Sequence, residues 1–163
     1  MHRRTFIGSC ASGLVSVGTV AEGQPASRIY RIGVLLGGTA DDAAPLLRAL
    51  TEALRGLGLV EGRNLVFESR YAGVRLERLP ELAAELVRLR VDVIVTGSNP
   101  FVAAARRATS TIPIVFVAAA DPVGAGLVAS LAKPEGNVTG LTTDASPELF
   151  AKNLGKVAQF WAR

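Results

Sequence analysis

Two short apolar runs with an alanine-rich segment between them form the clearest pattern in this chain. Residues 91–96 and 112–118 are apolar almost throughout and rich in β-branched side chains. Strands that are apolar on both faces are typical of a parallel sheet covered by helices on both sides, whereas half-exposed strands alternate. The pattern therefore predicts a strand–helix–strand unit inside a parallel sheet.

The flanking segments extend this unit in both directions. An apolar run at 28–36 predicts a first strand, residues 138–142 predict a last one, and the alternation at 65–71 predicts an edge strand with one wetter face. Leucines at three- and four-residue spacing predict helices over 76–90 and 123–131. They also predict a helix after the first strand that is ended by Gly56 and Gly58, with its buried face running from Leu46 to Leu57. The alternation of strands and helices predicts an α/β fold, a doubly wound parallel sheet of about five strands.

Small and polar residues follow three of these strands, where a doubly wound sheet binds its ligands. These turns are Gly37-Gly38-Thr39, Gly97-Ser98-Asn99 and Ala120-Asp121-Pro122. The glycine-rich first turn lacks both the G-x-G-x-x-G pattern and the lysine of a P-loop, so it predicts a close backbone approach to a ligand and not nucleotide binding. The three turns together predict half of a small-molecule pocket.

The polar side chains of these turns allow two interpretations each. Ser98 and Asn99 stand at a helix start, where N–H groups and the helix dipole fit a carboxylate, or they cap that helix. Asp121 either holds an ammonium group or caps the next helix. Asp41 and Asp42 are expected to cap the helix after the first turn.

The first 21 residues differ from the rest and predict an export signal. Arg3 and Arg4 form a positive start, a weakly apolar run follows, and Thr19-Val20-Ala21 suits a signal peptidase. The run is shorter than the roughly 20 apolar residues that span a bilayer. Arg-Arg-Thr-Phe-Ile also matches the twin-arginine export pattern, and an ordinary Sec signal with two arginines is the alternative.

Composition narrows the chemistry. The only histidine and the only cysteine, His2 and Cys10, both lie in the predicted signal. Without them we expect no thiolate nucleophile, histidine-based triad, zinc site or disulfide, and therefore no enzyme, metal or cofactor. Basic and acidic residues after the signal nearly balance. Arg106-Arg107 is the densest basic spot there and is expected on a solvated helix face, so nucleic-acid binding is not favoured.

Several stretches in order along the chain resemble one family, the ABC-transporter substrate-binding proteins of the tryptophan/tyrosine-transport type. They run from residue 3 to about residue 141: the Arg-Arg-x-Phe-Ile leader, RIGVLL, GLGLVEGRNLVFESRYA, RLPELAAELVRLRVDVIVTGSNP and TIPIVFVAAADPVGAGLVASLAKPEGNVTG.

The resemblance implies a lobe of a type I periplasmic-binding-protein-like fold, in which two lobes close around a ligand and deliver it to an ABC permease in the inner membrane. The ligand would be an amino acid, with aromatic ones included, or a related organic acid, and the protein would be periplasmic. The resemblance places the ligand at the three turns, and the expected contacts are Gly37, Gly38, Thr39, Gly97, Ser98, Asn99 and Asp121.

Family members are about twice as long as this chain, so we expect its first lobe only. The expected organisation is a signal at 1–21, a linker at 22–27, an α/β lobe at 28–145 and a helical tail at 146–163, with the second lobe absent. The apolar tail would favour self-association. The alternatives are a truncated remnant that transports nothing and a ligand-sensing regulatory lobe of the same fold.

Overall fold

The computed structural model describes residues 28–130 and 136–142. The predicted signal, linker and helical tail lie outside these residues. The elements are β1 (Tyr30–Leu36), α1 (Ala40–Arg55), β2 (Leu65–Tyr71), the 3-10 helix η1 (Leu76–Arg78), α2 (Leu79–Arg88), β3 (Val93–Thr96), α3 (Asn99–Ala108), β4 (Ile114–Ala119) and β5 (Val138–Thr142).

The five strands form one parallel sheet in the order β2-β1-β3-β4-β5. The chain first moves outward from β1 to β2, and then returns to the other side of β1 to continue with β3. This reversal makes the sheet doubly wound, as the sequence predicts. It also confirms β2 as an edge strand, and all but the first of its residues are only partly buried.

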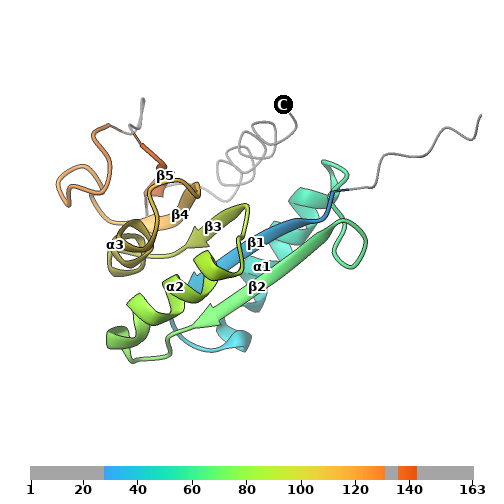
Figure 1. Ribbon diagram of the computed structural model, residues 1–163, viewed down its shortest axis with the longest axis horizontal. Coiled ribbons are helices and arrows are strands. Elements are labelled where there is room, and N and C mark those ends of the chain that lie inside the picture. The colour runs from blue at the N-terminus through green and yellow to red at the C-terminus, as the bar shows by residue number, and fades with distance from the viewer. Residues whose placement is uncertain (1–27, 131–135, 143–163) are drawn as a thin grey trace, which may run out of the picture.

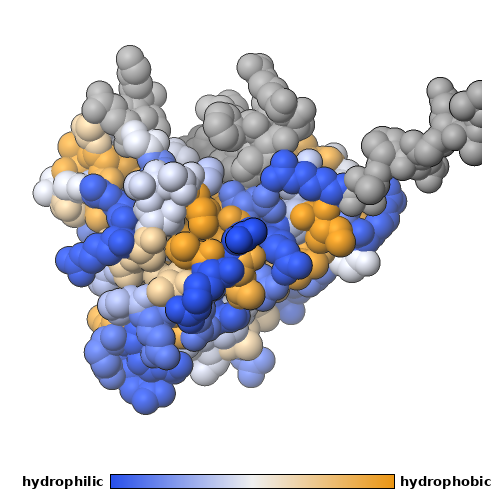
Figure 2. Space-filling model, in the orientation of Figure 1, coloured by the Kyte–Doolittle hydropathy of each residue, from blue (hydrophilic) through white to orange (hydrophobic). Residues whose placement is uncertain are grey.

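Two apolar clusters cover the two faces of the sheet. In Figure 1, α1 lies behind the sheet, and α2 and α3 lie in front of it. Leu50 and Leu54 of α1 pack against one face, and Leu82 and Leu86 of α2 belong to the cluster on the other. The face seen in Figure 2 is mainly hydrophilic, with hydrophobic patches between the hydrophilic side chains. Burial on both faces explains why the central strands are apolar throughout.

Two predictions about the helices are wrong. Leu57 was expected on the buried face of the first helix, but it lies beyond Gly56, where α1 ends as expected, and is 44% exposed. No helix forms over residues 123–130, the described part of the predicted fourth helix, which instead makes successive turns. Gly124 and Gly126 explain the second error, because each glycine costs a helix about 1 kcal/mol relative to alanine and Gly126 has a φ of 66°.

The N-terminus of α1 is capped by Thr39, and not by Asp41 or Asp42 as expected. The Thr39 hydroxyl and N–H both donate to Oδ2 of Asp42 at 2.8 Å, and the Asp42 N–H donates to the hydroxyl at 3.4 Å. This reciprocal capping box satisfies donors that a helix start leaves unpaired. The hydroxyl bond of Thr39, and then its N–H bond, hold the pKa of Asp42 below its ordinary value of 3.8.

A buried hydroxyl joins β1 to β3 where both strands end. Thr96 is fully buried, and its Oγ1 donates to the carbonyl oxygen of Leu35 at 2.9 Å. This bond gives a polar group in the core its partner, and it lies next to the turns that follow both strands.

The capping box predicts a pH-dependent effect of Asp42→Asn. A carboxylate whose pKa is lowered by folding stabilises the protein above its ordinary pKa, and this stabilisation is lost as the pH falls through the lowered pKa. At pH 7 the variant is therefore expected to be less stable than the wild type, and the difference should shrink below about pH 4. Urea unfolding across this pH range measures it. Asp41→Asn, in the same helical turn, is the control and should show no such convergence.

The buried hydroxyl predicts that Thr96→Val lowers the free energy of unfolding by about 1 kcal/mol, because the near-isosteric side chain leaves packing intact but removes the donor to Leu35. Urea denaturation of the full chain measures the loss. Thr139→Val in β5 is the matched control, since the Thr139 hydroxyl makes no hydrogen bond to another described residue. Equal stabilities of the two variants would contradict the prediction.

Candidate functional site

The turns after β1, β3 and β4 lie together at one edge of the sheet, the carboxyl edge. The three strands are parallel neighbours, so their ends point the same way. Asn99 joins two of the turns directly: its Nδ2 donates to the Ala120 carbonyl at 2.8 Å, and the Ala120 N–H donates to its Oδ1 at 3.0 Å. The edge includes the point between β1 and β3 where the strand order reverses, which is where such sheets bind ligands.

The first turn presents backbone more than side chain. Gly37 and Gly38 are partly buried, and the Thr39 hydroxyl is occupied by the capping box. Gly38 has a φ of 67°, and a Cβ there would lie 2.7 Å from Oδ2 of Asp42. Glycine is therefore required at Gly38, and the turn can offer a ligand a close approach to the main chain.

The turn after β3 keeps only part of the chemistry expected of it. Ser98 occupies the N-cap position of α3, but neither its side chain nor that of Asn99 makes the expected capping hydrogen bond. The Asn99 amide is occupied by Ala120, Pro100 has no N–H, and the N–H groups of Phe101 and Val102 donate to the Ser98 carbonyl. The start of α3 still offers an anion the exposed Ser98 hydroxyl and the dipole of a helix whose first turn has no acidic residue.

Asp121 lies on the exposed surface of the third turn in a left-handed backbone conformation, with a φ of 39°. Its Oδ1 accepts a hydrogen bond from the Gly124 N–H at 2.9 Å. A Cβ at Gly124 would lie 2.0 Å from Oδ2 of Asp121, so this approach needs glycine. The carboxylate thus caps a turn, in place of the expected helix, and stays accessible to solvent.

The sequence did not single out a fourth segment at this edge, the loop after β2. The Ala72 N–H donates to the Leu36 carbonyl at 2.9 Å, and the Gly38 N–H donates to Gly73 at 3.3 Å, so the loop is attached to the first turn. Val74 is 96% exposed and Leu76 is 48% exposed. The position of this loop after a parallel strand was the available signal. It adds apolar surface to the carboxyl edge.

The described residues contain neither a cluster of metal ligands nor a helix that could span a membrane. Within residues 28–130 and 136–142, no group of three or more histidine, cysteine, aspartate or glutamate residues could hold a metal ion. Over the same ranges, no helix is long and apolar enough to cross a membrane.

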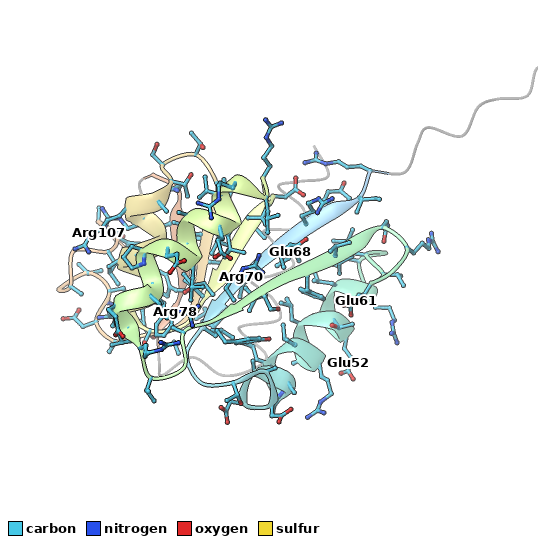
Figure 3. The ribbon with its side chains drawn as sticks, turned by 60° about the horizontal axis from the view of Figure 1, so that its bottom comes forward. Glu52, Glu61, Glu68, Arg70, Arg78 and Arg107 are labelled. Carbon is cyan, nitrogen blue, oxygen red and sulfur yellow. The ribbon has the colours of Figure 1, made fainter. Side chains whose placement is uncertain are left out.

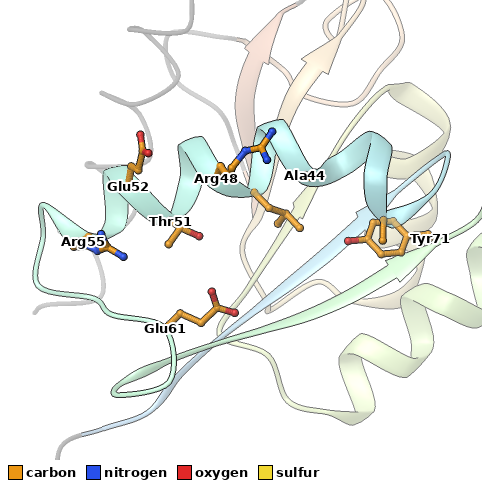
Figure 4. Close-up of a pocket in the computed structure, with 9 residues that line it drawn as sticks. Ala44, Arg48, Thr51, Glu52, Arg55, Glu61 and Tyr71 are labelled. Carbon is orange, nitrogen blue, oxygen red and sulfur yellow. The ribbon is translucent and has the colours of Figure 1, made fainter.

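A separate groove of about 440 Å³ runs between α1 and the edge strand β2 (Figure 4). It is lined by Ala40, Ala44, Leu47, Arg48, Thr51, Glu52, Arg55, Glu61 and Tyr71. Glu52 and Glu61 lie on the same outer side of the fold (Figure 3). The groove is open along its length, whereas small-molecule sites enclose most of their ligand. The carboxyl edge therefore remains the better candidate.

Comparisons with known proteins match most of this chain to one family. The family model described as "ABC transporter substrate binding protein" matches residues 34–153, which contain all three turns. A tyrosine-binding protein of Clostridioides difficile (strain R20291) is 37% identical over 120 residues, which make up 68% of this chain and 35% of that protein.

Solved structures show the same relationship. A conserved domain protein from Vibrio cholerae has a TM-score of 0.66 and 35% identity, over 79% of this chain and 43% of its own. A Streptococcus pneumoniae ABC domain in complex with L-Trp has a TM-score of 0.63 and 25% identity, over 70% of this chain and 38% of its own. This chain thus spans less than half the length of each relative. With more than half of its residues matched by the family model, the chain belongs to the ABC transporter substrate-binding proteins.

Proposed function

We propose that this chain is a solute-binding component of an ABC importer that binds an amino acid at the carboxyl edge of its sheet. The observation that carries the proposal is the family match across residues 34–153, which includes every turn at that edge. The tyrosine-binding relative and the relative solved with L-Trp favour an aromatic amino acid as the ligand. Binding and delivery, and no catalysis, would be its role.

The chemistry of the edge suits the two charged groups of an amino acid. The start of α3 and the Ser98 hydroxyl would receive the carboxylate, because a helix N-terminus attracts anions. Asp121 would receive the ammonium group through the carboxylate oxygen that the Gly124 N–H leaves accessible. Backbone at Gly37, Gly38, Thr39 and Gly97 would lie close to the ligand, and Asn99 would hold two of the turns together.

The ligand's side chain would lie against the apolar part of the edge. Val74 and Leu76 are exposed in the loop after β2, and Val123 is 45% exposed after β4. The described residues form one wall, and tight sites bury about 70–90% of a ligand's surface. We therefore expect this chain alone to bind with about millimolar affinity.

The leader and the family together support export. We propose that residues 1–21 direct the chain to the periplasm through the twin-arginine route, where it would meet a permease of the inner membrane. Arg3 and Arg4 distinguish the two export routes. The twin-arginine machinery recognises the arginine pair, whereas the Sec machinery needs only positive charge.

Ligand binding predicts a shift in thermal melting of the full chain. A ligand that binds only the folded state stabilises it, and at about ten times the dissociation constant the gain is about 1.4 kcal/mol. With L-tryptophan at about 10 mM we expect the midpoint to rise by about 3–6 °C. Asp121→Ala should abolish the rise, and Asp41→Ala should keep it. No rise with any amino acid would favour a non-transporting remnant.

Export predicts the location of a reporter fused after Arg163. The wild-type fusion should reach the periplasm, and replacing Arg3 and Arg4 by lysine should keep it in the cytoplasm, because lysine preserves the charge but not the arginine pair. Cell fractionation measures this. Export of the lysine variant would assign the Sec route, and a wild-type fusion that stays in the cytoplasm would overturn export altogether.

A further inference from the structure

The turn that carries Asp121 is held at both ends by α3. At its start, Asn99 in the first turn of α3 exchanges two hydrogen bonds with Ala120. At its end, about two helical turns further along α3, Nη1 of Arg106 donates to the carbonyls of Gly126 at 2.6 Å and Leu127 at 3.1 Å. Residues 120–127, called the Asp121 turn from here on, are therefore attached to one helix through two side chains.

The Asp121 turn needs such attachment because its backbone is unfavourable on its own. Asp121 adopts a left-handed φ of 39°, a conformation that residues with a side chain adopt only sparsely. Such conformations persist only where the surroundings impose them. The turn is mostly exposed, and it contains two glycines that add freedom to the unfolded chain. Pro122 and Leu127 are buried, whereas Asp121 and residues 123–126 are exposed, so packing holds only part of the turn.

We propose that Arg106, together with Asn99, is a positioning residue that fixes Asp121 for ligand binding. This proposal rests on the proposed binding of an amino acid at the carboxyl edge. Ser98 stands at the start of the same helix that holds the Asp121 turn. One rigid element therefore sets the spacing between the group that receives the carboxylate and the group that receives the ammonium. Such spacing would make the edge select α-amino acids, in which the two groups are one carbon apart.

The sequence offered a different role for this arginine. Arg106-Arg107 was expected to form a solvated basic spot, and both residues are exposed. They differ in their contacts, because Arg106 donates to two carbonyls while Arg107 makes no hydrogen bond or ion pair with another described residue. Arg107 extends away from the fold (Figure 3). Arg107 is thus a matched control, with the same charge and the adjacent position in α3.

The test compares Arg106→Ala, Arg106→Lys and Arg107→Ala in the full chain, with two measurements at a temperature where all are folded. The first is the affinity for L-tryptophan by calorimetry. The second is hydrogen exchange of the amides of residues 124–127, which donate hydrogen bonds within the turn and report its opening. Amides of β1 and β3 serve as the internal reference for global stability.

We expect Arg106→Ala to weaken binding about tenfold and to accelerate exchange of residues 124–127 by a similar factor, with no change in β1 and β3. Arg106→Lys should restore part of both, because lysine can still donate to one of the carbonyls. Arg107→Ala should change neither. Unchanged affinity in Arg106→Ala, or a loss matched by faster exchange throughout the sheet, would overturn the positioning role.

The design separates this proposal from the proposed function. If the wild-type chain binds no amino acid, the proposed function fails and the ligand role of Arg106 fails with it. The exchange data then still decide whether Arg106 holds the turn. If the wild type binds and Arg106→Ala leaves the affinity unchanged, amino-acid binding stands and the positioning role falls.

Discussion

The parallel order of the strands is the constraint on which the rest of the structure depends. Because β1, β3 and β4 point the same way, the turns that follow them meet at one edge, and α1 and α3 both begin there. The reversal of strand order at β1 separates the helices onto two faces, which lets both faces of the sheet be buried. The topology thus makes this edge the candidate site, and the side chains of the turns supply the chemistry that a ligand would meet there.

Most of the fold was predictable because periodicity reports burial. The uniformly apolar sequences of β3 and β4 predicted central strands, because a central strand is buried on two faces. The alternating sequence of β2 predicted an edge strand, which is less buried. The fourth helix failed because leucine spacing was weighed without Gly124 and Gly126. The cap of α1 was misplaced because Asp42 does take part in capping, but as the partner of Thr39.

The meeting of the three turns at one edge was predictable, and the bonding within and between them was much less so. The turn residues could be named from where strands end, but the partners of Asn99 and Arg106 lie 21 and 20 residues away in sequence, and no local pattern indicates such pairs. These hydrogen bonds also give both residues a role different from the one expected. Asn99 was a ligand or capping candidate, and it now joins two turns, while Arg106 changes from a solvated charge to a support.

The turns at the carboxyl edge can be ordered before any ligand arrives. Two separate contributions would then set the affinity, the ordering of the turns and the burial of the ligand. Fixing a flexible turn costs a ligand part of its binding energy, so a turn already held by α3 removes that cost. Burial of the ligand is a separate contribution, and exposed Val74, Leu76 and Val123 show that much apolar surface at the edge still faces solvent. The described residues would therefore supply orientation and selectivity, and the larger gain in affinity would come from whatever surface covers this edge.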